Sequence, residues 1–150
     1  MKNMVLLIDA NVVLDYLLNR EPHFADAYKV VTYCQSESVK GFIAFHSMSV
    51  IWYVLRNKPR EARRAALMDI CEILTVTGAP HAAVVEAVQN EDFPDFEDCL
   101  QEQCAATVHS DYIVTWNVPD FTTSKIPAVT PTKIMHLLEQ ETDAAEGAEP

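Results

Sequence analysis

Residues 4–9, MVLLID, form a short apolar run that is uninterrupted until it ends in an acid. A strand that is apolar at every position is buried on both faces, which is typical of a parallel sheet covered by helices on each side. Similar short runs recur along the sequence. We expect strands at residues 4–9, 41–45, 75–77, 112–115 and 126–129. Their alternation with helical segments predicts an α/β fold with a parallel sheet.

Between these strands, apolar residues recur every three to four positions, which is the spacing of one helix face. We expect helices at residues 11–21, 23–36, 46–55, 60–74, 80–89, 93–108 and 132–139. At 150 residues one domain is the default, and we place it at residues 1–138. Residues 139–150 hold five acidic residues and no basic one, so we expect an acidic, disordered tail there.

The composition excludes several classes of function. The three glycines are isolated, at positions 41, 78 and 147, which excludes a glycine-rich phosphate loop. Four cysteines without a CxxC pair and five dispersed histidines exclude a zinc site, and we expect buried, reduced thiols. The longest apolar run is far shorter than the ~20 residues that span a membrane. Because Asp9 also interrupts that run too early for a secretory signal, we expect a soluble, cytoplasmic protein that does not contact a membrane.

The charge is strongly acidic but unevenly distributed. The chain has 22 acidic and 11 basic residues, a net charge of −11, which by itself disfavours neutralisation of nucleic-acid phosphates. Five of the eleven basic residues, however, fall within residues 56–64. This stretch is either a solvated helix face paired with Glu61 and Asp69, or a phosphate-binding rim that includes Arg63 and Arg64.

Acidic and amide side chains follow the strands at their carboxyl ends, where open α/β sheets bind ligands. Asp9 ends the first strand, Asp98 lies at the start of the helix before the fourth strand, and Asn117 and Asp120 follow that strand. Oxygen donors of this kind suit Mg²⁺ or Mn²⁺, which activates water and polarises phosphoryl oxygens. Asp95 and its neighbour Glu97 either cap the helix or add to this cluster.

These segments resemble the PIN domain family, which includes the VapC-type toxins. The resemblance spans residues 4–136 and rests on five pieces in this order: LLIDANVVLDYLLNREP, HSMSVIWYVLRN, DFEDCLQ, DYIVTWNVPDF and IPAVTP. It implies a three-layer α/β/α sandwich with a central, mainly parallel sheet of four to five strands. It also implies a Mg²⁺- or Mn²⁺-dependent endoribonuclease that hydrolyses single-stranded RNA, forms homodimers and pairs with a small antitoxin protein.

Site residues follow from the resemblance by position. The catalytic residues would be Asp9, Asp98 and Asp120. The metal ligands would be Asp9, Asp98, Asn117 and Asp120. Supporting roles would fall to Asn11, Ser47, Asp95 and Thr115, with Asp15 either structural or functional. Independently of the resemblance, the basic stretch and the place of Trp116 beside the site predict RNA binding by Arg63, Arg64 and Trp116, the last by stacking on a base, whereas Trp52 fits the core or a dimer interface better.

Two departures from the family pattern keep other functions open. Many members carry an acid about where Val50 stands, but residues 41–57 contain no carboxylate, and Asn117 replaces a common Asp. A catalytically weak or inactive RNA-binding or interaction module is therefore the alternative. A third class is a phosphatase of the haloacid-dehalogenase type, which also begins LLID and would use Asp9 as nucleophile. It needs an acid or Thr two residues later, where this chain has Asn11.

Overall fold

The computed structural model describes residues 3–148 and contains a parallel sheet of five strands. The strand order is β3-β2-β1-β4-β5. The strands are β1 (Met4–Ile8), β2 (Val39–Ala44), β3 (Thr75–Thr77), β4 (Tyr112–Val114) and β5 (Ala128–Val129). The prediction of an α/β fold with a parallel sheet is confirmed.

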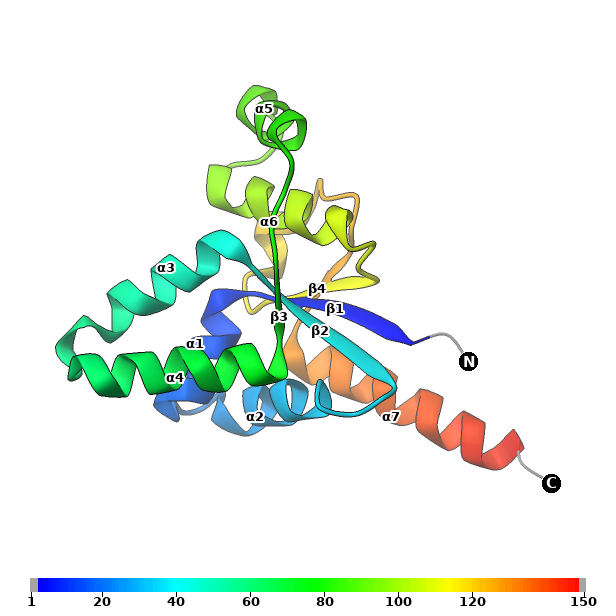
Figure 1. The fold of residues 1–150 in the computed structure, drawn as a ribbon. Coiled ribbons are helices and arrows are strands. Elements are labelled where there is room, and N and C mark those ends of the chain that lie inside the picture. The colour runs from blue at the N-terminus through cyan, green and yellow to red at the C-terminus, as the bar shows by residue number, and fades with distance from the viewer. Residues whose placement is uncertain (1–2, 149–150) are drawn as a thin grey trace.

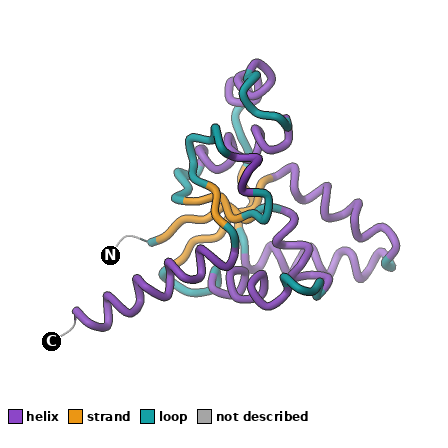
Figure 2. Tube along the Cα trace, turned by 180° about the vertical axis from the view of Figure 1, so that it is seen from behind, coloured by secondary structure: helices purple, strands orange, loops and turns teal. Residues whose placement is uncertain are grey.

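Helices cover both faces of this sheet (Figures 1 and 2). They are α1 (Ala10–Leu18), α2 (Phe24–Tyr33), α3 (Phe45–Val54), α4 (Arg60–Ile73), α5 (His81–Gln89), α6 (Phe96–Thr107) and α7 (Pro131–Ala148). Two short 3₁₀ turns complete the list, η1 (Leu55–Asn57) and η2 (Val118–Phe121). In Figure 1, α1, α2, α4 and α7 lie below the sheet and α5 and α6 lie above it, which makes three layers.

The central strand β1 separates two apolar cores. Leu6 and Ile8 point into the core shared with α1, α2, α4 and α7, whereas Leu7 points into the core shared with α5 and α6. All three side chains are fully buried. This alternation explains why β1 is apolar at every position, as expected for a strand covered on both faces.

The chain changes direction across the sheet at β1. From β1 it runs outward through β2 to β3, and it then returns to the other side of β1 to form β4 and β5. A crevice opens at the carboxyl ends of strands at such a switch point, because the connections on the two sides lead away from each other. Asp9 directly follows β1, and Thr115 directly follows β4, so both lie at this point.

The C-terminal segment, where the sequence predicts an acidic tail from residue 139, is described as part of a helix up to residue 148. Helix α7 continues to Ala148 and projects beyond the body of the molecule (Figure 1). Glu, Gln and Ala have high helix propensities, and the buried Leu138 fixes the preceding turn. Thr142 also contacts Tyr33 of α2, with 3.3 Å between the two hydroxyl oxygens. Residues 149 and 150 of the expected tail lie outside the described residues.

The cysteines are all free, and three of them, Cys34, Cys99 and Cys104, are buried as expected. Cys71 departs from the expectation, because it lies on the outer face of α4 and is exposed. Among residues 3–148, no helix is both long and apolar enough to cross a membrane.

Candidate functional site

A pocket of about 260 Å³ opens at the carboxyl ends of β1 and β4. It gathers side chains from the segments that follow β1 and β4, from α3 and from the start of α6. The lining residues are Asp9, Ala10, Asn11, Leu14, Arg20, Val50, Asp95, Glu97, Asp98, Asn117 and Asp120. The structure thus brings together all three predicted catalytic carboxylates and the predicted ligand Asn117. We refer to this cavity as the acidic pocket.

Asp9 is the most firmly held carboxylate of the acidic pocket. It is the N-cap of α1, and its Oδ1 accepts the backbone N–H of Ala10 at 2.7 Å. Gln101 Nε2 also donates to Oδ1, at 3.2 Å, and Thr115 Oγ1 donates to Oδ2 at 2.8 Å. Burial raises the pKa of Asp9, although the hydrogen bonds from Thr115 and Ala10 act in the opposite direction. With both oxygens bonded, the carboxylate has a fixed orientation.

Thr115 connects Asp9 to the polar residues around it. Its hydroxyl donates to Asp9 and accepts two hydrogen bonds, from Asn11 Nδ2 at 3.3 Å and from the backbone N–H of Asn117 at 3.0 Å. The side chain is fully buried. A hydroxyl can donate once and accept twice, so Thr115 uses its whole hydrogen-bonding capacity at the site.

Gln101 is a residue of this network that sequence reasoning missed. It lies in α6, is fully buried, and its Nε2 donates both to Asp9 and to Ser47 Oγ, the latter at 2.9 Å. Its Oε1 has no hydrogen-bond partner within the described residues. The available signal was its position three residues after Asp98, which places both side chains on the same face of the helix.

Asp98 shows the electrostatic character of the pocket. The side chain is half-buried, and its pKa is raised to about 7, first by burial and then by the negative charges of Asp95, Asp9, Asp120 and Glu97. Asp95 also caps α6, because its Oδ1 accepts the backbone N–H of Glu97 at 2.8 Å. Capping and membership of the acidic pocket are therefore compatible for Asp95.

The residues at the two departures from the family pattern both line the acidic pocket. Val50 of α3 contributes an apolar wall, and Asn117 contributes a neutral amide beside Asp120 of η2. Both positions face the carboxylates. The acidic pocket therefore lacks the two carboxylates that many family members carry at these positions.

The donor set fits a hard divalent cation that keeps much of its water. Within the described residues, no three carboxylate, imidazole or thiolate groups are arranged as a ready metal cage. Mg²⁺ in particular is held in proteins by one or two carboxylates, with water and substrate phosphate completing its shell. Burial and, after it, the convergence of negative charge raise the pKa of Asp98, and a bound cation would relieve the repulsion between these charges.

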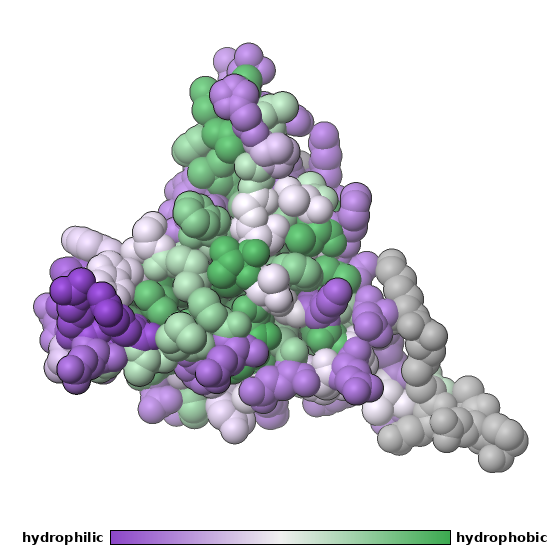
Figure 3. Space-filling model, in the orientation of Figure 1, coloured by the Kyte–Doolittle hydropathy of each residue, from purple (hydrophilic) through white to green (hydrophobic). Residues whose placement is uncertain are grey.

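The predicted RNA-binding arginines lie outside the acidic pocket. Arg63 covers the ring of Trp52, with its guanidinium carbon 3.7 Å from the ring centre, and its Nη2 donates to the Trp52 carbonyl at 2.9 Å. Arg64 is exposed on α4. Both arginines lie near the start of α4, and comparison of Figures 1 and 3 shows a strongly hydrophilic area where α3 turns into α4.

The ion pairs expected for the basic stretch are not formed. Within residues 3–148, neither Glu61 nor Asp69 pairs with an arginine or lysine. Asp69 instead accepts a hydrogen bond from the Tyr16 hydroxyl at 3.1 Å. An aromatic side chain, Trp52, takes the place of an acid as the partner of Arg63, and periodicity of charge alone does not reveal such a contact.

Trp116 also has a neighbour that the sequence did not indicate. The imidazole of His23 stacks on its indole, with ring centres 4.0 Å apart and planes at 27°. One face of Trp116 is therefore covered by the protein, which limits the predicted stacking on a base to the other face. Its backbone N–H lies 3.5 Å from Asn11 Oδ1, which keeps this segment beside the acidic pocket.

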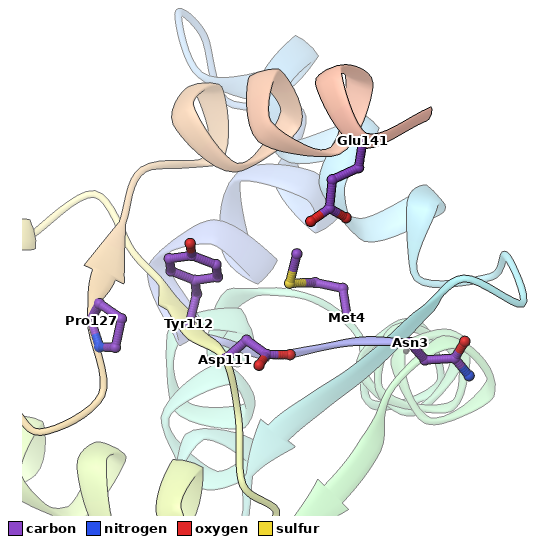
Figure 4. A pocket seen from close by; sticks show the side chains of 6 residues that line it. All are labelled: Asn3, Met4, Asp111, Tyr112, Pro127 and Glu141. Atoms are coloured by element: carbon purple, nitrogen blue, oxygen red, sulfur yellow. The ribbon is translucent and has the colours of Figure 1, made fainter. Parts of the chain in front are cut away.

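A second pocket, of about 330 Å³, lies at the opposite edge of the sheet (Figure 4). Its lining residues are Asn3, Met4, Asp111, Tyr112, Pro127 and Glu141. Here Asp111 Oδ2 accepts the backbone N–H of Val5 at 2.8 Å and so joins the starts of β1 and β4. We refer to it as the amino-edge pocket.

The chain is similar to known proteins both in sequence, through a family model, and in fold. The family model of the PIN domain matches residues 5–119. No curated protein matches the sequence.

Several solved structures share the fold at low sequence identity. VapC20 of Mycobacterium tuberculosis, described as a toxin that cleaves the sarcin–ricin loop, aligns with a TM-score of 0.64 and 14% identity over 84% of this chain and 99% of its own. VapBC2 of Rickettsia felis, bound to a DNA fragment of its promoter, aligns with a TM-score of 0.63 and 14% identity over 85% and 98%. VapBC-1 of nontypeable Haemophilus influenzae aligns with a TM-score of 0.61 and 16% identity over 86% and 99%.

Proposed function

The chain belongs to the PIN domain family, and on that premise we propose that it is a metal-dependent endoribonuclease that hydrolyses single-stranded RNA. The observation that carries the proposal is the acidic pocket, where Asp9, Asp98 and Asp120 converge at the switch point of the sheet. In this proposal the protein is the toxin of a VapC-type toxin–antitoxin pair and acts in the cytoplasm. The likeness to toxin–antitoxin structures supports that assignment.

The residues that would hold Mg²⁺ or Mn²⁺ are Asp9, Asp98, Asp120 and Asn117. The chemistry such an ion supplies is polarisation of a phosphoryl oxygen and a lower pKa for water. The chain itself fixes the Asp9 carboxylate through Thr115 and Gln101, and so determines where substrate phosphate meets the acids. Burial and the neighbouring carboxylates raise the pKa of Asp98 to about 7, and a bound cation would favour its carboxylate form.

The test is cleavage of a labelled mixed-sequence single-stranded RNA in Mg²⁺, in Mn²⁺ and in EDTA. We expect cleavage by the wild type with either metal and none in EDTA. Asp9→Asn and Asp98→Asn should lose activity, whereas Asp143→Asn, which removes an exposed acid of α7, should retain it. Full activity of Asp9→Asn would refute the proposal.

A second candidate function is a catalytically weak or inactive RNA-binding or interaction module. The apolar wall at Val50 and the neutral amide of Asn117 favour it, since both reduce the charge available to a cation. Retention of RNA without cleavage in Mn²⁺ would support this function over the first.

We also propose a homodimer and a small protein antitoxin as partners. Large apolar side chains are exposed on α5, on β3 and at the start of α3: Val84, Val85, Val88, Val76 and Phe45. Figure 3 shows hydrophobic residues gathered over this part of the molecule. Light scattering after size-exclusion chromatography should give twice the chain mass, and Val88→Asp should return the monomer. The antitoxin should suppress RNA cleavage when added in equimolar amount.

A further inference from the structure

Among the residues that the structure describes, Arg20 is the one cationic side chain that lines the acidic pocket, together with five carboxylates. A strongly negative pocket repels RNA phosphates, so a fixed positive charge on its rim matters for any phosphorylated substrate. The basic stretch at residues 56–64 lies outside the pocket and cannot serve this purpose at the reacting bond.

Arg20 is held by two hydrogen bonds to Asp15, one from its backbone N–H and one from its side chain. Helix α1 ends at Leu18, and Asn19 adopts the left-handed conformation with φ 51° and ψ 44°, which turns the chain back. The backbone N–H of Arg20 then donates to the Asp15 carbonyl at 3.1 Å. Its Nε donates to Asp15 Oδ1 at 2.9 Å. Both the start and the head of the side chain are therefore anchored to α1.

This anchoring leaves most of the guanidinium donors available. A guanidinium has five N–H donors, and Asp15 takes the one on Nε. Within the described residues, Nη1 and Nη2 have no hydrogen-bond partner, and the only ion pair of Arg20 is with Asp15. The Asp15 side chain is 8% exposed and that of Arg20 is 44% exposed, so the acid is buried while the cation reaches solvent at the pocket.

We propose that Arg20 is a substrate-binding residue that contacts a backbone phosphate of the RNA through its two terminal nitrogens. Paired N–H donors of this geometry bind phosphate oxygens in a bidentate manner, and Asp15 preorganises them. Arg20 would thereby supply at the pocket the positive charge that the acidic chain otherwise lacks. The inference rests on the proposed ribonuclease function, which it extends by naming a phosphate-binding group.

The first experiment compares cleavage kinetics of wild type, Arg20→Met and Arg20→Lys. We expect Arg20→Met to raise KM about tenfold and to reduce the dependence of kcat/KM on salt by about one phosphate contact. Arg20→Lys keeps the charge and the pairing with Asp15 but loses the planar fork, so its KM should be intermediate. It also covers the case in which Arg20→Met unfolds because Asp15 is left unpaired, which thermal melting would show.

The charge-matched control is Lys40→Met, which removes an exposed cation on β2 near the opposite edge of the sheet. It should leave KM and the salt dependence unchanged. Mn²⁺ affinity gives a further readout, because removing a cation from an acidic pocket should leave metal binding equal or tighter. Wild-type KM and salt dependence in folded Arg20→Met, or a wild-type KM in Arg20→Lys if Arg20→Met does not fold, would overturn the inference and leave Arg20 as a neutraliser of Asp15.

A second experiment separates this inference from the proposed function. Inorganic phosphate is titrated into ¹⁵N-labelled protein while the Arg20 Nε resonance, assigned by its loss in Arg20→Met, is followed by NMR. A saturable shift supports a phosphate site at Arg20, and its absence overturns the inference. If wild type cleaves no RNA in Mg²⁺ or Mn²⁺, the ribonuclease proposal fails, and this titration alone decides the role of Arg20.

Discussion

The two edges of the central sheet carry pockets of similar size but opposite construction. In the amino-edge pocket, Asp111 accepts a backbone N–H from β1, so its carboxylate joins two strands (Figure 4). In the acidic pocket, Asp9 accepts the backbone N–H of its neighbour Ala10 together with side-chain donors from Thr115 and Gln101, and further acids surround Asp98. The Asp111 carboxylate links two strands and so contributes to stability, whereas the carboxylates gathered around Asp98 repel one another, and a cation can relieve that repulsion.

Two substitutions test most directly whether the two pockets differ in function. One removes the Thr115 hydroxyl of the acidic pocket, and the other replaces the Asp111 carboxylate of the amino-edge pocket. Thr115→Val keeps the shape but removes the hydrogen-bond partner of Asp9 Oδ2 and of Asn11 Nδ2, so we expect RNA cleavage and Mn²⁺ affinity to fall about 10- to 100-fold. Asp111→Asn should instead lower the melting temperature and leave kcat/KM at the wild-type value. A large activity loss in Asp111→Asn would show that the two edges are not functionally distinct.

Adding a carboxylate to the acidic pocket should increase the difference between the two pockets in cation binding. Val50→Glu places a carboxylate on the apolar wall, and we expect it to tighten Mn²⁺ binding about tenfold, the effect of one favourable ionic contact of ~1.4 kcal/mol. The matched control is Ser49→Glu, one residue earlier and exposed on α3. Isothermal titration calorimetry with Mn²⁺ measures both. Equal affinity in the two variants would mean that Val50 does not face the cation.

Substitution of Gln101 should have a smaller effect on RNA cleavage at the acidic pocket. Gln101→Leu removes the donor to Asp9 but also removes the unpaired Oε1, so we expect up to about tenfold lower cleavage with little change in stability. Gln103→Leu, the same substitution two residues later in α6, is the control. Activity that is reduced equally in both variants would point to helix packing rather than to Asp9.

The smallest expected effect concerns the pH dependence of stability without metal. The folded-state pKa of Asp98 is about 7, above its ordinary value of 3.8, so between these values the folded protein binds the extra proton. The melting temperature of metal-free wild type should therefore fall, relative to Asp98→Asn, as pH rises from about 4 to 7. The difference should level off above pH 7, and saturating Mn²⁺ should reverse it. A parallel pH profile for the two proteins would contradict the raised pKa.

The layers of the fold and the location of the candidate site could be predicted from sequence patterns, because both depend on local periodicity. The fully apolar strand before Asp9, together with the alternation of strands and helices, was enough to predict a parallel sheet and to bring Asp9, Asp98 and Asp120 to one edge. Contacts between distant side chains were beyond this reasoning. Gln101 lies 92 residues from Asp9 in sequence, and only the packing of α6 against β1 brings their side chains together.

The same distinction explains the other differences. Arg63 was predicted as an RNA-binding residue in a basic stretch that was either a phosphate-binding rim or a helix face paired with acids, but it lies over Trp52, because the turn between α3 and α4 folds the two helices side by side. Helix α7 extends to Ala148, in keeping with the helix propensity of its residues and the contact of Thr142 with α2, neither of which the charge of this segment indicates. Charge and polarity predict exposure well, but they do not predict which neighbour an exposed residue has.

The spacing of the site residues along the chain has a consequence for biosynthesis. Asp9, Ser47, Gln101 and Thr115 come from four elements spread over most of the sequence, and they join in one hydrogen-bonded network. Since β4 is the strand that places Thr115 beside Asp9, a growing polypeptide lacks the network until that strand has left the ribosome. A chain released before β4 is complete therefore carries the acids of the first strand and of α6 without the arrangement that orients them.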